Sequence, residues 1–266
     1  MNERAREGII AKLARADEHL ERLRHDIDTW LDGKPHSYWA KPDFHTGRYS
    51  IHITIHGDPP ALLSVVCGDF VHCLRSALDH LVCGNVKKIT KRTAFPIYRD
   101  GDDFFCGVLL PARRKQWGPL TGLDPDGELF AMVKDVQPYM GPDGYEAHFL
   151  HVLAELSNAD KHRAILASAA ANRLVADQEL WVRGNDIVCS DAEYALGTPL
   201  VNGAKVAWGT LTVVGAKPEM EMEHDFPVEV AFGSALVGLE ALEEVRKGVR
   251  AAIALAFQIL GLSAPP

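Results

Sequence analysis

The chain has 266 residues, 47% of them hydrophobic and 24% charged, which is the profile of a globular protein long enough to fold without disulfides or metal. Its net charge of -8 excludes a generally basic nucleic-acid coat, so we expect no broad DNA binding. No apolar run reaches the roughly 18 residues of a membrane span, and the first residues lack a signal peptide's apolar core. We therefore expect a cytoplasmic protein with no membrane partner.

The cysteines predict neither a disulfide framework nor a zinc knuckle. They are odd in number and never form C-x-x-C: Cys67, Cys73, Cys83, Cys106 and Cys189.

The first predicted elements are a long helix and a strand. The helix ends at Asp32-Gly33, and its apolar residues recur three and four apart, as in a helix packed against others: Leu13, Ala16, Leu20, Leu23, Ile27 and Trp30. Residues 48–56 alternate strictly between apolar and polar side chains, which predicts a half-buried strand.

Helices dominate the next hundred residues. Asp58 and two prolines open a second long helix that we expect to reach about residue 88. Glycine and proline interrupt residues 93–125, and shorter helices are predicted over 127–136 and 145–163.

The pattern changes after residue 165. Segments rich in valine and tryptophan, or alternating in polarity, predict strands over 179–189, 204–214, 219–224 and 227–232. Ser234 is predicted to cap a last helix that reaches about residue 260.

These elements predict the α+β class, with long helices forming a bundle packed with a small antiparallel sheet from the C-terminal half. Without repeats or a linker, we expect one domain over 1–266. Its helical part covers about 1–165 with one strand near 48–56, its β-rich part about 166–232, and its C-terminal helix about 234–260.

The helix predicted over 60–88 segregates its polar residues. At 100° per residue, one face carries Asp69, His72, Cys73, Ser76, Asp79, His80 and Cys83, opposite an apolar stripe. A solvated helix face normally draws on lysine and glutamate, and this face has neither. The residue types favour a cleft or a polar interface.

Two interpretations of this face follow from spacing alone. A metal site fails because His72 and His80 lie two turns apart, about 12 Å along the axis, so we predict no metal and no cofactor. A structural interpretation pairs Arg75 with Asp79 at i,i+4 and leaves the histidines to buried partners.

A third interpretation is chemical. Arg75-x4-His80 resembles the R-x4-6-H motif of HEPN-domain ribonucleases, in which the Arg and His of two protomers meet at a dimer interface and cleave RNA without metal. The resemblance implies a homodimer in which Arg75 steadies the phosphate, His80 acts as acid or base, and Asp79 or Asp160 orients the imidazole.

The helix over 145–163 carries a second polar face, on which Glu155, Asn158 and His162 align. It ends in four consecutive ionisable residues, Asp160-Lys161-His162-Arg163, of which the helix dipole explains only the basic members. We predict that this face shares a binding site with the first helix, formed by His72, Ser76, Glu155, Asn158, Asp160, Lys161, His162 and Arg163.

Four motifs occur in a fixed order: LRSALDHLV at 74–82, AFPI at 94–97, QPY at 137–139, and DKHR ending at 163. In this order they resemble an uncharacterised, largely actinobacterial protein family. The resemblance covers about residues 58–165 and implies that the two polar helix faces belong to one recurrent unit.

Two functions compete on these grounds. The first is a binding or interaction module with a polar Asp/His/Arg network between two helices, whose partner is a small ligand, a protein or RNA. The alternative is a HEPN-like, metal-independent RNA endonuclease of toxin or defence type that uses Arg75 and His80. The sequence leaves open whether the protein is an enzyme.

Overall fold

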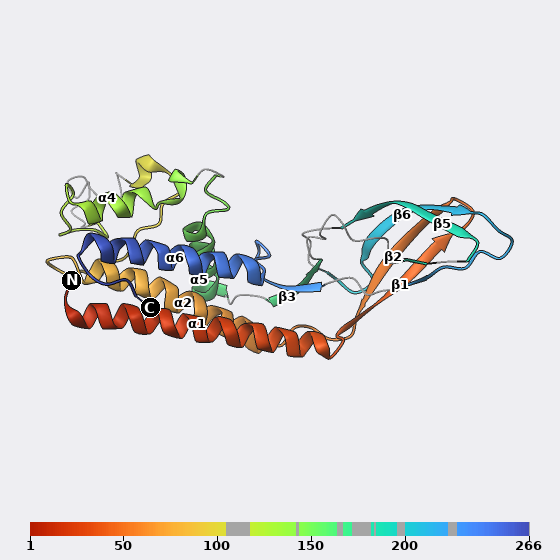
Figure 1. The fold of residues 1–266 in the computed structure, drawn as a ribbon, viewed down its shortest axis with the longest axis horizontal. Coiled ribbons are helices and arrows are strands. Elements are labelled where there is room, and N and C mark those ends of the chain that lie inside the picture. Colours follow the sequence, from red (N-terminus) through yellow and green to blue (C-terminus); the bar gives the residue numbers. More distant parts are fainter. Residues whose placement is uncertain are drawn as a thin grey trace. The chain divides into compact units, whose positions relative to one another are not determined.

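The computed structural model describes residues 1–104, 118–141, 144–163, 167–171, 182–183, 185–195, 200–222 and 228–265. The chain divides into two compact units, each assembled from separate segments. The first consists of Met1–Leu23, Ser64–Ile165 and Leu239–Pro266, and the second of Arg24–Leu63 and Leu166–Gly238. The first is helical and the second is built on a sheet, which confirms the α+β class (Figure 1).

The helical unit contains most of the long helices. Its elements are α1 (Glu3–Asp32) and α2 (Ala61–Cys83), whose ends extend into the second unit, α4 (Glu128–Asp135), the 3-10 turn η1 (Pro138–Met140), α5 (Phe149–Arg163) and α6 (Leu239–Ile259). The seam predicted for α1 is confirmed except at Trp30, which is only partly buried. The buried residues are Leu13, Ala16, Leu20, Leu23 and Ile27.

The sheet unit is centred on four antiparallel strands, β1 (His36–Asp43), β2 (Arg48–Ile55), β5 (Ile187–Tyr194) and β6 (Lys205–Val213), in the order β1-β2-β6-β5. One face of this sheet is its core, in which Tyr49, Ile51 and Ile53 of β2 are buried as their alternation predicts. Two short antiparallel pairs complete the unit: β3 (Ala167–Ala171) with β8 (Val228–Phe232), and β4 (Val182–Arg183) with β7 (Glu221–Met222).

The origin of the sheet differs from the prediction. We expected it to come from the C-terminal half with one possible earlier strand, whereas β1 and β2 supply half of the four-stranded sheet. β1 was not predicted, and its Pro42 is a residue that normally argues against a strand interior. β1 is an edge strand, where a missing N–H is tolerated.

Three helix boundaries also differ, for local reasons. α2 ends at Cys83, just before Gly84, rather than near residue 88. α5 begins at Phe149 rather than 145, after Gly144 with φ +84°. Ser234 does not cap α6, because the chain reverses between Phe232 and Val237, with Leu236 at φ +50°, before the helix begins at Leu239.

The expectation of one α+β domain over 1–266 stays a prediction. The chain folds into two compact units, but it crosses from one to the other repeatedly along the sequence. A single unfolding transition observed by both far-ultraviolet circular dichroism and tryptophan fluorescence would show that they unfold together.

Among the described helices, only α2 is long and apolar enough to cross a membrane. Charged residues interrupt every apolar run of this helix, so it was not predicted as a membrane span. Its average hydropathy is nevertheless high enough for one. More than half of the apolar 18-residue stretch of α2 is buried inside the protein, as in a core helix.

Candidate functional site

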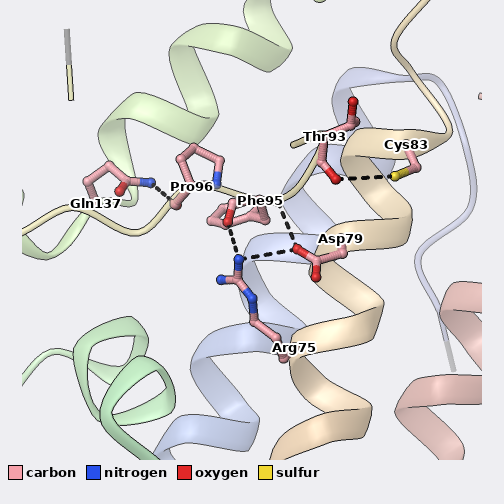
Figure 2. A network of polar contacts seen from close by, with 7 residues as sticks. All are labelled: Arg75, Asp79, Cys83, Thr93, Phe95, Pro96 and Gln137. Carbon is pink, nitrogen blue, oxygen red and sulfur yellow. Dashed lines mark hydrogen bonds and ion pairs between the residues drawn. The ribbon is translucent and has the colours of Figure 1, made fainter. Parts of the chain in front are cut away.

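Arg75 and Asp79 of α2 hold the backbone of Phe95 from both of its peptide groups (Figure 2). Arg75 Nη2 donates to the Phe95 carbonyl oxygen at 2.5 Å, and the Phe95 amide donates to Asp79 Oδ1 at 2.8 Å. The two side chains also form the predicted i,i+4 ion pair, with 3.3 Å between Nη2 and Oδ1. These contacts of Arg75 and Asp79 with the Phe95 backbone, which we call the clamp, place the Phe95 ring in the core, where it is fully buried.

Burial sets the electrostatics of this clamp. The Arg75 side chain is only 18% exposed, and burial lowers the pKa of its guanidinium while the Asp79 carboxylate raises it. Arginine stays charged at neutral pH in either case, so the clamp is ionic. One turn further on, burial and Asp79 raise the pKa of the Cys83 thiol, which lies 3.9 Å from the Thr93 carbonyl oxygen.

Gln137 holds the next residues of the same segment and is fully buried. Its amide nitrogen donates to the Pro96 carbonyl oxygen at 3.0 Å, and its amide oxygen accepts from the Tyr98 amide at 2.9 Å. A second bond from the same nitrogen to the Val133 carbonyl oxygen, at 2.8 Å, ties the side chain to α4. Every polar atom of this buried amide therefore has a backbone partner.

Three of the four sequence motifs meet in this network. LRSALDHLV contributes Arg75 and Asp79, AFPI contributes Phe95 and Pro96, and QPY contributes Gln137 (Figure 2). Gln137 belongs to the QPY motif but was not among the predicted site residues. A glutamine directly before a proline at a helix end was the available signal, because the proline ends the helix and leaves the neighbouring backbone groups to be satisfied.

Glu155 of α5 anchors the far end of the segment. Its Oε1 lies 2.5 Å from Nη2 of Arg99, and the Arg99 guanidinium stacks 5.7 Å from the centre of the Tyr145 ring. The Tyr145 ring meets that of His151 edge-on at 5.3 Å. Residues 93–99, which we call the clamped segment, are thus fixed by α2, by Gln137 and by α5.

His80 and His72 lie elsewhere on α2 and take no part in the clamp. A Cβ atom added to Gly8 of α1 would lie 2.8 Å from Nδ1 of His80, so the imidazole packs against α1. His72 is exposed, and its Nε2 lies 3.3 Å from the Ser76 hydroxyl. Arg75 and His80 thus contact different neighbours.

The end of α5 does not join the clamp either. A Cβ atom added to Gly68 of α2 would overlap Oδ1 of Asp160, so the exposed carboxylate rests on the α2 backbone. It also contributes to the raised pKa, about 12, of the buried Cys67 thiol, although desolvation is the larger cause. Asn158 and Lys161 are exposed. The side chains of His162 and Arg163 lie outside the described residues.

The predicted residues therefore do not converge on one site. Arg75 and Asp79 form the clamp, and Glu155 binds the far end of the clamped segment. His80 packs against α1, His72 contacts Ser76, and Asp160 rests on α2. Within the described ranges, no three His, Cys, Asp or Glu side chains are grouped closely enough to hold a metal ion. Comparison of the chain with protein-family models, curated proteins and solved structures gave no match.

Proposed function

We propose that the protein is a binding or interaction module whose Asp/Arg network is structural rather than catalytic. The observation that carries this proposal is the clamp. The Arg75 cation binds the Phe95 carbonyl oxygen and the Asp79 carboxylate at the same time. A guanidinium held in this way is already neutralised and is not directed toward an incoming phosphate.

The energetics support the same proposal. A hydrogen bond to a charged group contributes about 1.5–3 kcal/mol, and leaving a buried partner unpaired costs a similar amount. Phe95 depends on such charged bonds, whereas Pro96 and Tyr98 are held by the neutral Gln137 amide, whose bonds contribute about 0.5–1.5 kcal/mol each. The network rigidifies the clamped segment, and a rigid segment presents a fixed surface to a small ligand, a protein or RNA.

The HEPN-like ribonuclease is the second candidate. One observation favours it: the His80 imidazole makes no hydrogen bond within the described part of the chain, and this side chain is only half-buried, which leaves it available for proton transfer. That activity would require a second protomer to bring another Arg75 toward His80, and the Arg75 clamp would have to open.

Incubation of purified protein with total RNA, without metal, distinguishes the two candidates. We expect the wild type, His80→Ala and Arg75→Met to leave the RNA equally intact, with Arg75→Met also lowering the thermal unfolding temperature. Cleavage by the wild type that His80→Ala abolishes, in a variant that still folds, would establish the nuclease and overturn the module. Size-exclusion chromatography with light scattering shows whether the required dimer exists.

A further inference from the structure

The four-stranded sheet of the second unit carries polar residues on the face opposite its core. A cavity of about 510 Å³ opens on it, a volume typical of sites for small organic ligands. All of its lining residues belong to the four strands or to the turn between β1 and β2, and the ones used below are Lys41, Arg48, His52, Glu193, Lys205 and Trp208. The cavity is therefore a feature of this unit alone.

The strand register orders these side chains in rows. Lys41 pairs with Ser50, Ser50 with Trp208, and Trp208 with Glu193, so one row crosses all four strands. Arg48 lies on β2 two residues from Ser50 and is thus a diagonal neighbour of Lys41, about 7–8 Å away between backbones. Two long cationic side chains at that spacing can reach one phosphate.

Three cations and three carboxylates line the cavity, and the carboxylates accept hydrogen bonds from neutral groups rather than from these cations. Lys41, Arg48 and Lys205 form no ion pair within the described residues. Asp43 accepts from the backbone amides of His45 and Thr46, both at 3.0 Å.

Glu193 is engaged too, since its Oε2 accepts from the indole N–H of Trp208 at 2.9 Å. The third carboxylate, Asp191, accepts from the Ser190 hydroxyl at 3.0 Å. Asp43 lies opposite Arg48 in the β1–β2 register, but within the described chain none of these carboxylates forms an ion pair with Lys41, Arg48 or Lys205.

Aromatic rings lie among these cations. The Lys205 ammonium rests 4.1 Å from the centre of the Trp208 ring, an exposed contact that contributes about 0.5–1 kcal/mol and that a ligand ring can replace. On the neighbouring row, Trp39 stacks on His52 with 4.5 Å between ring centres and 14° between planes, while remaining 44% exposed.

His52 is fixed at both ring nitrogens, 3.1 Å from the Gly203 carbonyl oxygen and 3.0 Å from the Ser50 hydroxyl. Since the carbonyl can only accept, Nδ1 carries a proton. The His52 ring, on which Trp39 stacks, is therefore held in place before any ligand arrives.

We propose that this concavity binds a nucleotide, either free or within a single strand of nucleic acid, with the phosphate on Lys41 and Arg48 and the base against Trp208. Aromatic rings on a sheet surface flanked by cations are the arrangement by which proteins take single-stranded bases, because every base has a stacking face. The three carboxylates of the cavity equal its three cations in number, so the phosphate contact rests on charge-assisted hydrogen bonds from Lys41 and Arg48 rather than on a net positive field.

The proposal is tested by fluorescence anisotropy of the full chain with labelled oligo(U) and oligo(dT) of about eight nucleotides. Oligo(dT) lacks the 2′-hydroxyl that RNA cleavage needs, so its binding does not depend on whether the protein is a nuclease. We expect Trp208→Ala to weaken binding about tenfold and Trp208→Phe to restore part of it. Arg48→Ala and Lys41→Ala should each weaken binding. Each lost phosphate contact should also reduce the slope of log binding constant against log salt concentration by about 0.7.

Lys217→Ala is the matched control, because Lys217 is an exposed lysine of the same unit outside the cavity. It should leave affinity unchanged. Competition by unlabelled uridine monophosphate, at concentrations comparable with the oligonucleotide, would assign the site to a free nucleotide. Competition by the oligonucleotide alone would assign it to a single strand.

Two results would overturn the proposal. The first is a dissociation constant above about 100 µM for both oligonucleotides and the mononucleotide, which is no better than non-specific binding. The second is binding that depends on charge alone, for which no aromatic ring is needed. In that case Trp208→Ala would leave the affinity unchanged and heparin would compete. Lys217→Ala would then weaken binding as much as Arg48→Ala does. Circular dichroism of each variant confirms that it is folded.

Discussion

The two units use the same kinds of polar residue in opposite ways. In the helical unit, Arg75, Asp79 and Gln137 are turned toward backbone groups that would otherwise lack partners. On the sheet of the second unit, Lys41 and Arg48 face solvent in a cavity, and within the described residues no anion pairs with them. Clustering on one helix face therefore indicated structure, and alternation on a strand indicated an accessible surface.

Substitution of Gln137 should give the largest effect on stability. Gln137→Ala leaves the buried Pro96 carbonyl and Tyr98 amide without partners, so we expect the free energy of unfolding to fall by about 3 kcal/mol. Urea denaturation followed at the helical circular dichroism signal measures it. Gln258→Ala on the exposed side of α6 is the control and should change stability by less than about 0.5 kcal/mol. Equal effects would show that Gln137 is not a structural anchor.

Breaking the clamp comes next. Asp79→Leu removes the acceptor of the Phe95 amide and leaves the Arg75 guanidinium with only the Phe95 carbonyl, so we expect a loss of about 2 kcal/mol. Asp79→Asn keeps an acceptor oxygen and should lose less. In a double-mutant cycle, Arg75→Met with Asp79→Leu should lose less than the sum of the single variants. Strict additivity would contradict the clamp.

A smaller effect concerns pH. Burial lowers the pKa of His148, and the neighbouring His151 lowers it further. Its Nδ1 also accepts from the Leu150 amide at 3.2 Å, at the start of α5. Because the folded pKa lies below the unfolded value of about 6.5, the unfolded state binds more protons. The stability contribution is therefore complete above that value and is lost as pH falls through it toward the folded pKa.

This pH effect can be measured from urea denaturation at about pH 7.5 and about pH 5.5. His148→Asn keeps a helix-capping acceptor without titrating, so its loss of stability on acidification should be smaller than that of the wild type. His45→Asn, in the exposed turn after β1, is the matched control. An unchanged pH dependence in His148→Asn would exclude this histidine as a cause.

The smallest effect is predicted for the sheet surface, and it sharpens the contrast between the units. Arg48→Ala and Lys41→Ala remove cations without a partner in the described chain, so each should change the free energy of unfolding by less than about 0.5 kcal/mol. The same variants are those expected to weaken oligonucleotide binding. A stability loss as large as that of Asp79→Leu would mean that these cations are structural too.

Local patterns predicted much of the fold. The α1 seam and the alternation of β2 were confirmed because burial imposes periods of 3.6 and 2 directly on the sequence. The sequence could not show that β2 pairs with β6, because such pairing depends on contacts between distant segments. β1 was not predicted, and its Pro42 is unfavourable within a strand interior. The proline is tolerated because this strand lies at the edge of the sheet.

The site was predicted less well than the fold. The Arg75–Asp79 pair followed from helical spacing, but its partner, the backbone of Phe95, has no signature in side-chain identity. Asp79 and His80 are adjacent, so their side chains leave the helix about 100° apart although both were assigned to one face. Asp79 therefore contacts Phe95, whereas His80 packs against α1. The cavity on the sheet was missed because its lining comes from four strands, of which only β2 was considered as a polar face.

The division of the sheet unit between distant segments affects how the protein can be made. Arg48 of β2 pairs with Thr210 of β6, so about 160 residues must be synthesised before the central pair can form. At about 5–20 residues per second that interval lasts roughly 10–30 seconds. A hairpin of β1 and β2 is at best marginal on its own, so the nascent chain exposes Ile51 and Ile53 and an unpaired strand edge for that time. During that interval the exposed strand edge is open to pairing with other chains.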